Sequence, residues 1–150
     1  MNIKIDRLLF IFISYINLQF YTPYKKIQKD PEYVIINSKS IYWIVKPKSF
    51  LLTRYETQNL FRLTREAISE YNHNKPYNGK IGDLTVYKVQ LVPYLNGKNQ
   101  KCVWVNCFCD EIEYWKKDIV LVDDGGTCYF NLKINLDKGK YFDFAVNGLG

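Results

Sequence analysis

The sequence predicts an α+β domain in which one long amphipathic helix packs on a curved, antiparallel β-meander. Residues 54–72 repeat apolar side chains at helical spacing, and residues 84–146 alternate apolar with polar side chains between turn sequences. The chain of 150 residues is also rich in aromatics, with 13 Tyr, 9 Phe and 3 Trp, which suit pleated, half-buried surfaces. This length is enough for one domain with its own core, and we place that domain at residues 25–150.

The N-terminus has the pattern of an export signal. Lys4 and Arg7 precede the apolar run 8–13, which is too short for a transmembrane helix of roughly 20 apolar residues. Asp6 dilutes the positive charge, however, and no A-x-A-like cleavage site follows. We therefore expect residues 1–24 to be an export signal, with a first buried element of the domain as the alternative. Export would place the protein in the periplasm or outside the cell, and the alternative is the cytoplasm.

The helix is bounded by local signals on both sides. Thr53 and Glu56 have the spacing of a capping box, and Pro76 follows the end of the apolar stripe. Before it, residues 33–36 and 41–45 are β-branched runs that predict a hairpin. The helix should therefore span residues 54–72, with an apolar stripe formed by Leu60, Phe61, Leu63, Ala67, Ile68 and Tyr71.

Strands and turns should make up the rest of the chain. Strands are predicted at residues 84–95, 101–109, 119–122, 127–136 and 140–146. Asn96-Gly97, residues 123–126 and residues 137–139 are expected to be hairpin turns, and Pro93 suits a sheet edge or a bulge. Side chains alternate between the faces of a strand. That rule predicts an inner face toward the helix, formed by Tyr87, Val89, Leu91, Val103, Val105, Cys107, Cys109, Cys128, Phe130, Leu132, Ile134, Leu136, Phe142, Phe144 and Val146.

The four cysteines allow three interpretations. The first is buried free thiols that pack as small apolar side chains. The second is one disulfide in an exported protein, joining Cys128 to Cys107 or to Cys109. The third, a zinc site, is disfavoured because C-x-C is not a zinc spacing and because His73 is the single histidine.

No catalytic constellation is evident. His73 at the helix end is better suited to the helix dipole than to a Cys–His pair. Asp123 and Asp124 precede two glycines, which is typical of a turn rather than of paired catalytic carboxylates. We therefore expect no catalytic residues, no cofactor and no metal.

The outward face of the predicted sheet is the candidate binding surface. Aromatic rings beside amide groups suit a protein, a peptide or a saccharide. The alternative is cross-strand pairing beneath a loop or beneath the N-terminal segment. The residues concerned are Trp104, Asn106, Phe108, Tyr129, Asn131 and Tyr141.

Three segments resemble a family of small uncharacterised bacterial proteins that are often exported. They are residues 103–109 (VWVNCFC), 123–135 (DDGGTCYFNLKIN) and 146–148 (VNG). The resemblance implies no activity and no site residues. The order of elements is also similar to cystatin-like and NTF2-like architectures, a likeness of fold that does not imply function. Residues 90–94 lack the glycine of the inhibitory cystatin hairpin, so we do not expect protease inhibition.

A non-enzymatic, exported binding or interaction protein is the function that these observations predict. The alternatives are a small enzyme with an NTF2-like pocket and an immunity or structural partner of another protein. The net charge is +6, but the lysines are scattered, so we expect no nucleic-acid partner. We expect no integral membrane span, and a homodimer could form through the outward sheet face.

Overall fold

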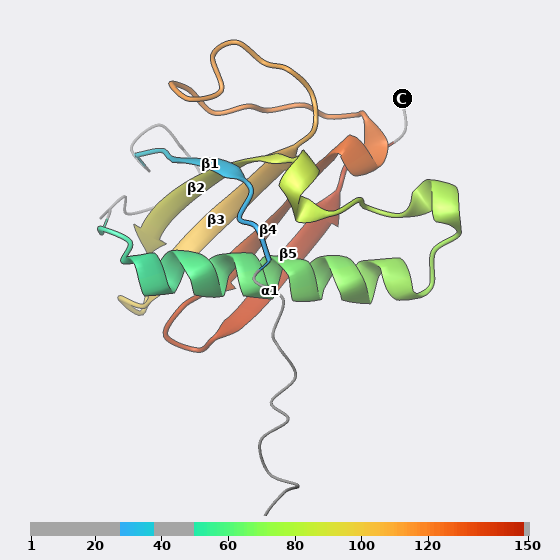
Figure 1. Cartoon of the computed structure of the whole chain (residues 1–150). Coiled ribbons are helices and arrows are strands. Elements are labelled where there is room, and N and C mark those ends of the chain that lie inside the picture. The colour runs from blue at the N-terminus through green and yellow to red at the C-terminus, as the bar shows by residue number, and fades with distance from the viewer. Residues whose placement is uncertain (1–27, 38–49, 149–150) are drawn as a thin grey trace, which may run out of the picture.

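The computed structural model describes residues 28–37 and 50–148, and Figure 1 shows their arrangement. In chain order the elements are strand β1 (Glu32–Ile35), helix α1 (Arg54–His73) and strands β2 (Lys88–Leu95), β3 (Lys101–Phe108), β4 (Tyr129–Asn135) and β5 (Lys140–Val146). The fold of this part of the chain is α+β, as predicted. The predicted signal at residues 1–24 and the predicted strand at 41–45 lie outside the described residues. No helix within the described ranges is long and apolar enough to cross a bilayer.

Helix α1 begins and ends close to where the sequence places it. The Thr53 hydroxyl accepts a hydrogen bond from the Glu56 backbone N–H at 3.2 Å, and the Glu56 carboxylate accepts one from the Thr53 N–H at 2.9 Å. The capping box is therefore present and satisfies N–H groups that the first turn leaves unpaired. The helix buries Thr57, Leu60, Phe61, Leu63, Thr64, Ala67 and Ile68.

The sheet is open and mixed, with the strand order β1-β2-β3-β4-β5. Strands β2 to β5 pair antiparallel, as predicted, but β1 runs parallel to β2. The meander therefore describes four of the five strands. Parallel neighbours need a long crossover, and α1 lies in the connection between β1 and β2. Pro93 lies two residues beyond the last β1–β2 pair, Ile35 with Leu91, so among the described residues it has a strand neighbour on one side only.

Helix α1 lies across one face of the sheet, the helix face (Figure 1). The alternation predicted for β2, β3 and β4 holds on this face. Leu63 and Ala67 share one buried cluster with Phe130 and Leu132, which places the helix over β4 as expected. The same cluster includes Tyr87, Val89, Leu91, Val103, Val105, Cys107 and Ile134.

Two of the predicted hairpin turns form. In the β2–β3 turn the Asn96 N–H donates to the Gln100 carbonyl at 3.0 Å, and Asn99 takes a positive φ of 57°. In the β4–β5 turn the Gly139 N–H donates to the Leu136 carbonyl at 3.2 Å, and Gly139 has a φ of 61°. Both turns use a left-handed residue, which Gly and Asn tolerate better than other residues do.

Strand β5 departs from the predicted alternation because it contains an irregularity. Asp143 has a φ of 51°, and the β4–β5 register shifts between Asn131 and Lys133. A bulged residue reverses the facing of the side chains on either side of it. Tyr141 therefore packs on the helix face and Phe142 is 40% exposed on the other face, which is the reverse of the prediction. Beyond the bulge Phe144 and Val146 again pack on the helix face.

Two further segments differ from the predicted strands. Residues Leu84–Val86 form a 3-10 turn, so β2 starts only at Lys88. Residues 119–122 form no strand, and residues 123–126 form no hairpin. Residues 119–126 belong instead to an irregular segment, residues 109–128, which ends in the 3-10 turn Gly126–Cys128. This cover segment, orange in Figure 1, packs against the sheet face opposite α1, which we call the cover face.

Candidate functional site

The six residues predicted to form a binding surface do not lie on one exposed surface. Trp104, Asn106 and Phe108 lie on the cover face, but their exposed fractions are only 5%, 9% and 0%. Tyr129 lies partly buried beside them, and Tyr141 lies on the helix face. Of the two interpretations left open, the structure favours pairing beneath a loop. A ligand or a second copy could reach Asn106 and Phe108 only by displacing the cover segment, whereas Trp104 is buried in a cluster with Ile36 and Val92.

Aromatic side chains form the contact between the cover segment and the sheet. The rings of Phe108 and Trp115 meet edge to face, with centroids 5.9 Å apart. The ring of Tyr129 stacks on that of Phe108, with the two centroids 6.5 Å apart. Trp104 belongs to a second cluster, and its indole N–H donates to Asn131 Oδ1 at 3.2 Å. The cover face is therefore a second core.

A buried pair of amide side chains holds the cover segment in place. The Gln90 side chain is 0% exposed, and its Nε2 donates to the backbone carbonyls of Trp115 and Asp118 at 2.6 and 2.7 Å. Its Oε1 accepts hydrogen bonds from the Val120 backbone N–H at 3.0 Å and from Asn106 Nδ2 at 3.1 Å. Asn106 Nδ2 also donates to the Val120 carbonyl at 2.8 Å. These amides therefore bind the protein's own backbone rather than a ligand.

A disulfide joins the two ends of the cover segment. Cys109 and Cys128 are bonded, with their Cα atoms 5.1 Å apart. This is one of the two pairings that the sequence left open, whereas Cys102 and Cys107 are buried free thiols. Cys109 was predicted to face inward, but β3 ends at Phe108 and Cys109 is exposed. Burial raises the pKa of the Cys107 thiol well above its ordinary value, so it packs as a neutral apolar group.

The disulfide also bears on metal binding. The ligand atoms of Cys109, Asp110 and Cys128 lie within 4.8 Å of one another. Zinc binds cysteine as the thiolate, and two sulfurs that are bonded to each other offer none. This cluster is therefore not a zinc site in the oxidised protein.

Tyr129 is fixed from two sides at the ends of the cover segment. Its phenol donates to the Asp110 carboxylate at 2.5 Å, and this hydrogen bond raises the pKa of Tyr129 to about 12. Gly125 has a φ of 91°, and a Cβ atom there would come within 2.6 Å of the Tyr129 ring. Only glycine meets both conditions, because it has no Cβ and it tolerates positive φ.

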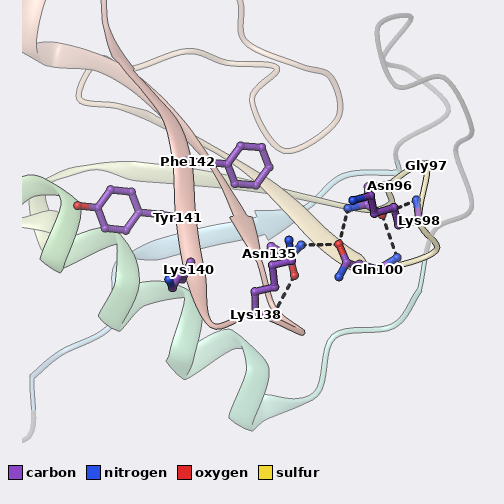
Figure 2. A pocket seen from close by; sticks show the side chains of 9 residues that line it. All are labelled: Asn96, Gly97, Lys98, Gln100, Asn135, Lys138, Lys140, Tyr141 and Phe142. Atoms are coloured by element: carbon purple, nitrogen blue, oxygen red, sulfur yellow. Dashed lines mark hydrogen bonds between the residues drawn. The ribbon is translucent and has the colours of Figure 1, made fainter.

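A hollow of about 550 Å³ lies at the end of the sheet where the β2–β3 and β4–β5 turns meet (Figure 2). We call it the hairpin-tip hollow. Figure 2 shows Tyr141 and Phe142 on opposite sides of β5, and the Tyr141 phenol donates to the Glu70 carboxylate of α1. That bond raises the pKa of Tyr141 to about 12. The hollow is lined by Asn96, Gly97, Lys98, Gln100, Asn135, Lys138, Lys140, Tyr141 and Phe142.

Amide hydrogen bonds tie the two turns together at the hollow (Figure 2). Gln100 Oε1 accepts from Asn96 Nδ2 and from Asn135 Nδ2, each at 3.0 Å. Asn135 Oδ1 in turn accepts from the Lys138 backbone N–H at 3.0 Å. The lining is thus positioned by side chains of both hairpins rather than by either loop alone.

No family model matches this chain, and no curated protein and no solved structure is significantly similar to it. The resemblance to small exported bacterial proteins therefore stays a prediction. The hairpin-tip hollow and the disulfide are the features from which a function can be argued.

Sequence reasoning identified the turns that form the hollow but not the hollow itself. Consecutive antiparallel strands place every second turn at the same end of a sheet. The predicted strand at residues 119–122 would have put the turns at 96–100 and 137–139 at opposite ends, and they meet only because that segment forms no strand. The lysines of these turns look like scattered surface charges in the sequence, because the residues that bring them together are far apart along the chain.

Proposed function

We propose that this chain is a non-enzymatic, exported binding protein that holds a small ligand in the hairpin-tip hollow. The observation that carries this proposal is the lining: an exposed ring, three lysines and cross-linked amides around about 550 Å³. Ligand sites commonly occupy roughly 300–1,000 Å³ and combine apolar surface with a few fixed polar groups. Asn135 and Phe142 lie on the cover face beyond Trp104, so the hollow continues the face that the sequence singled out.

The chemistry of the lining supports binding rather than catalysis. The nine lining residues include no carboxylate, histidine or thiol that could act as a base beside a nucleophile. A small enzyme of the NTF2-like kind would need a buried acid in a deep pocket. Every described Asp and Glu is exposed or only partly buried.

Export is supported by the disulfide. Such bonds persist in oxidising compartments and are rare in the cytoplasm. The native protein should therefore carry the Cys109–Cys128 bond and begin near residues 22–29. Intact mass spectrometry of the protein from its native source tests both points, and a reduced chain with an intact Met1 would contradict export.

For the architecture, we propose the cystatin-like rather than the NTF2-like arrangement. The order of one helix followed by four antiparallel strands supports it. An NTF2-like pocket would lie between helix and sheet, where Leu60, Phe130 and Leu132 are at most 1% exposed and fill the space.

The site is tested by screening a fragment library of neutral, cationic and anionic members against the full-length oxidised protein by ¹⁵N NMR. Bound fragments should shift the amide signals of residues 96–100 and 138–142. Phe142→Ala should weaken fragment binding. Tyr114→Ala, which removes an exposed ring of the cover segment instead, should leave fragment binding unchanged. A library that leaves the hollow untouched or that shifts another surface would overturn the proposal.

A further inference from the structure

The hairpin-tip hollow also carries a charge pattern that narrows the class of its ligand. Lys98, Lys138 and Lys140 line it, and no lining residue is acidic. The carboxylate of Asp137, in the same turn, is turned to another partner, the Lys101 backbone N–H at 2.9 Å. The hollow is therefore electropositive.

These three lysines differ from four others on the surface. The described part of the chain pairs the side chains of Lys88, Lys101, Lys116 and Lys133 with carboxylates. Within the same described ranges the three lysines of the hollow form no ion pair. An unpaired ammonium group can give its full charge to a ligand without first breaking an internal contact.

The hollow also offers neutral donors and an apolar platform. Gln100 Oε1 accepts both amide hydrogen bonds to its side chain, and Nε2 makes no hydrogen bond to the described residues, so it can donate to a ligand. Phe142 is 40% exposed at the rim. Its ring can stack against a flat apolar face, and the amide donors suit hydroxyl groups.

From this combination we propose that the ligand is an acidic saccharide, a sugar ring that carries a carboxylate. The proposal rests on the proposed function and specifies its ligand. A bare anion such as phosphate would use the lysines but would leave the ring and most of the volume unused. A neutral sugar would use the ring and amides but not the lysines. An acidic peptide such as triglutamate would pair with the lysines. It has no flat ring to stack on Phe142 and no hydroxyl groups to accept from Gln100 Nε2.

Titration calorimetry with four probes tests this: a galacturonic acid trimer, a neutral galactose trimer, triglutamate and inorganic phosphate. The uronic acid trimer should bind most tightly, and its affinity should fall as salt is raised. The double variant Lys138→Gln, Lys140→Gln should weaken it at least about tenfold, which corresponds to about 1.4 kcal/mol for the charged contacts that both lysines lose. Lys117→Gln, an exposed lysine of the cover segment, is the matched control and should leave binding unchanged.

The other outcomes separate this inference from the proposed function. Equal or tighter binding of the neutral trimer, triglutamate or phosphate would overturn the acidic saccharide as ligand, and so would no binding of the uronic acid trimer. If neutral or cationic fragments still occupy the hollow in the NMR screen, the binding function stands while this inference fails. If no fragment and no probe occupies the hollow, both fail. Spectra of each variant that match those of the parent establish that the fold is retained.

Discussion

The two faces of the sheet are both buried, but different chemistry covers them. The helix face meets an α-helix and is apolar, with Val89, Val103 and Leu132 at 0% exposure. The cover face meets an irregular segment and buries Gln90 and Asn106 among its rings. A helix satisfies its own backbone hydrogen bonds, so the sheet beneath it can be entirely apolar. An irregular segment leaves N–H and C=O groups unpaired, and the sheet beneath it must supply polar partners.

This difference explains why the cover face resembled a ligand site in the sequence. Amides and rings in alternation are what a ligand surface would show, and they are also what a loop-covered face requires. The following substitutions test whether the cover face is a second core of this kind.

The largest effect should come from Trp104→Ala. Removal of a buried aromatic typically costs about 3–5 kcal/mol of unfolding free energy. Leu132→Ala on the helix face should cost roughly 2–5 kcal/mol, so the two faces should be similarly important. Urea unfolding monitored by circular dichroism measures both values.

Phe142→Ala is the matched control for Trp104, because it removes from the same face a ring that is 40% exposed rather than 5%. Its cost should be much smaller, within about 1 kcal/mol. A Trp104→Ala variant as stable as the Phe142→Ala variant would mean that the cluster of Trp104, Ile36 and Val92 on the cover face contributes no core.

The next effect should come from the disulfide that joins the ends of the cover segment. Replacing Cys109 and Cys128 by serine opens a loop whose ends are 19 residues apart in sequence. The loop-closure model gives a loss of about 3 kcal/mol. Hydrogen exchange should accelerate first at Trp115 and Val120, while α1 stays protected. Equal acceleration on both faces would show that they do not loosen separately.

A smaller effect is expected for Gln90→Leu, which keeps the volume but removes the amide. The Val120 N–H and two backbone carbonyls then lose their partner. We expect a loss of roughly 1–3 kcal/mol, the cost of one buried group left unpaired, because water can reach the others once the segment loosens. An unchanged free energy of unfolding would contradict the role of Gln90 as the anchor of the cover segment.

The smallest effect concerns Tyr129 and pH. Its folded pKa of about 12 lies above the ordinary value of 10. The Tyr129–Asp110 bond therefore contributes stability below about pH 10 and loses it as the pH rises through about 12. Asp110→Asn should move the pKa of Tyr129 down toward its ordinary value. A ¹³C-tyrosine NMR titration measures this, with Tyr141, which is raised by Glu70, as the unaffected control.

Much of the helix face could be predicted because its signals are local. The Thr53–Glu56 capping box and the Pro76 stop set the helix to within one residue. Alternation placed the inward side chains of β2, β3 and β4 correctly. The same rule failed in β5, because Asp143 adopts a positive φ that nothing in the neighbouring residues signals, and one bulged residue inverts the facing of Tyr141 and Phe142.

The sequence by itself determined the α+β class, the helix, the antiparallel strands β2 to β5 and the two turns at the hollow. The tertiary structure decided that β1 runs parallel, which depends on the path of the chain around α1. It also decided that residues 109–128 cover the second face, and that Cys109 rather than Cys107 bonds to Cys128. The physical reason is range: capping and alternation act between residues a few positions apart, whereas Gln90 meets Val120 only after 30 residues have been folded back over the sheet.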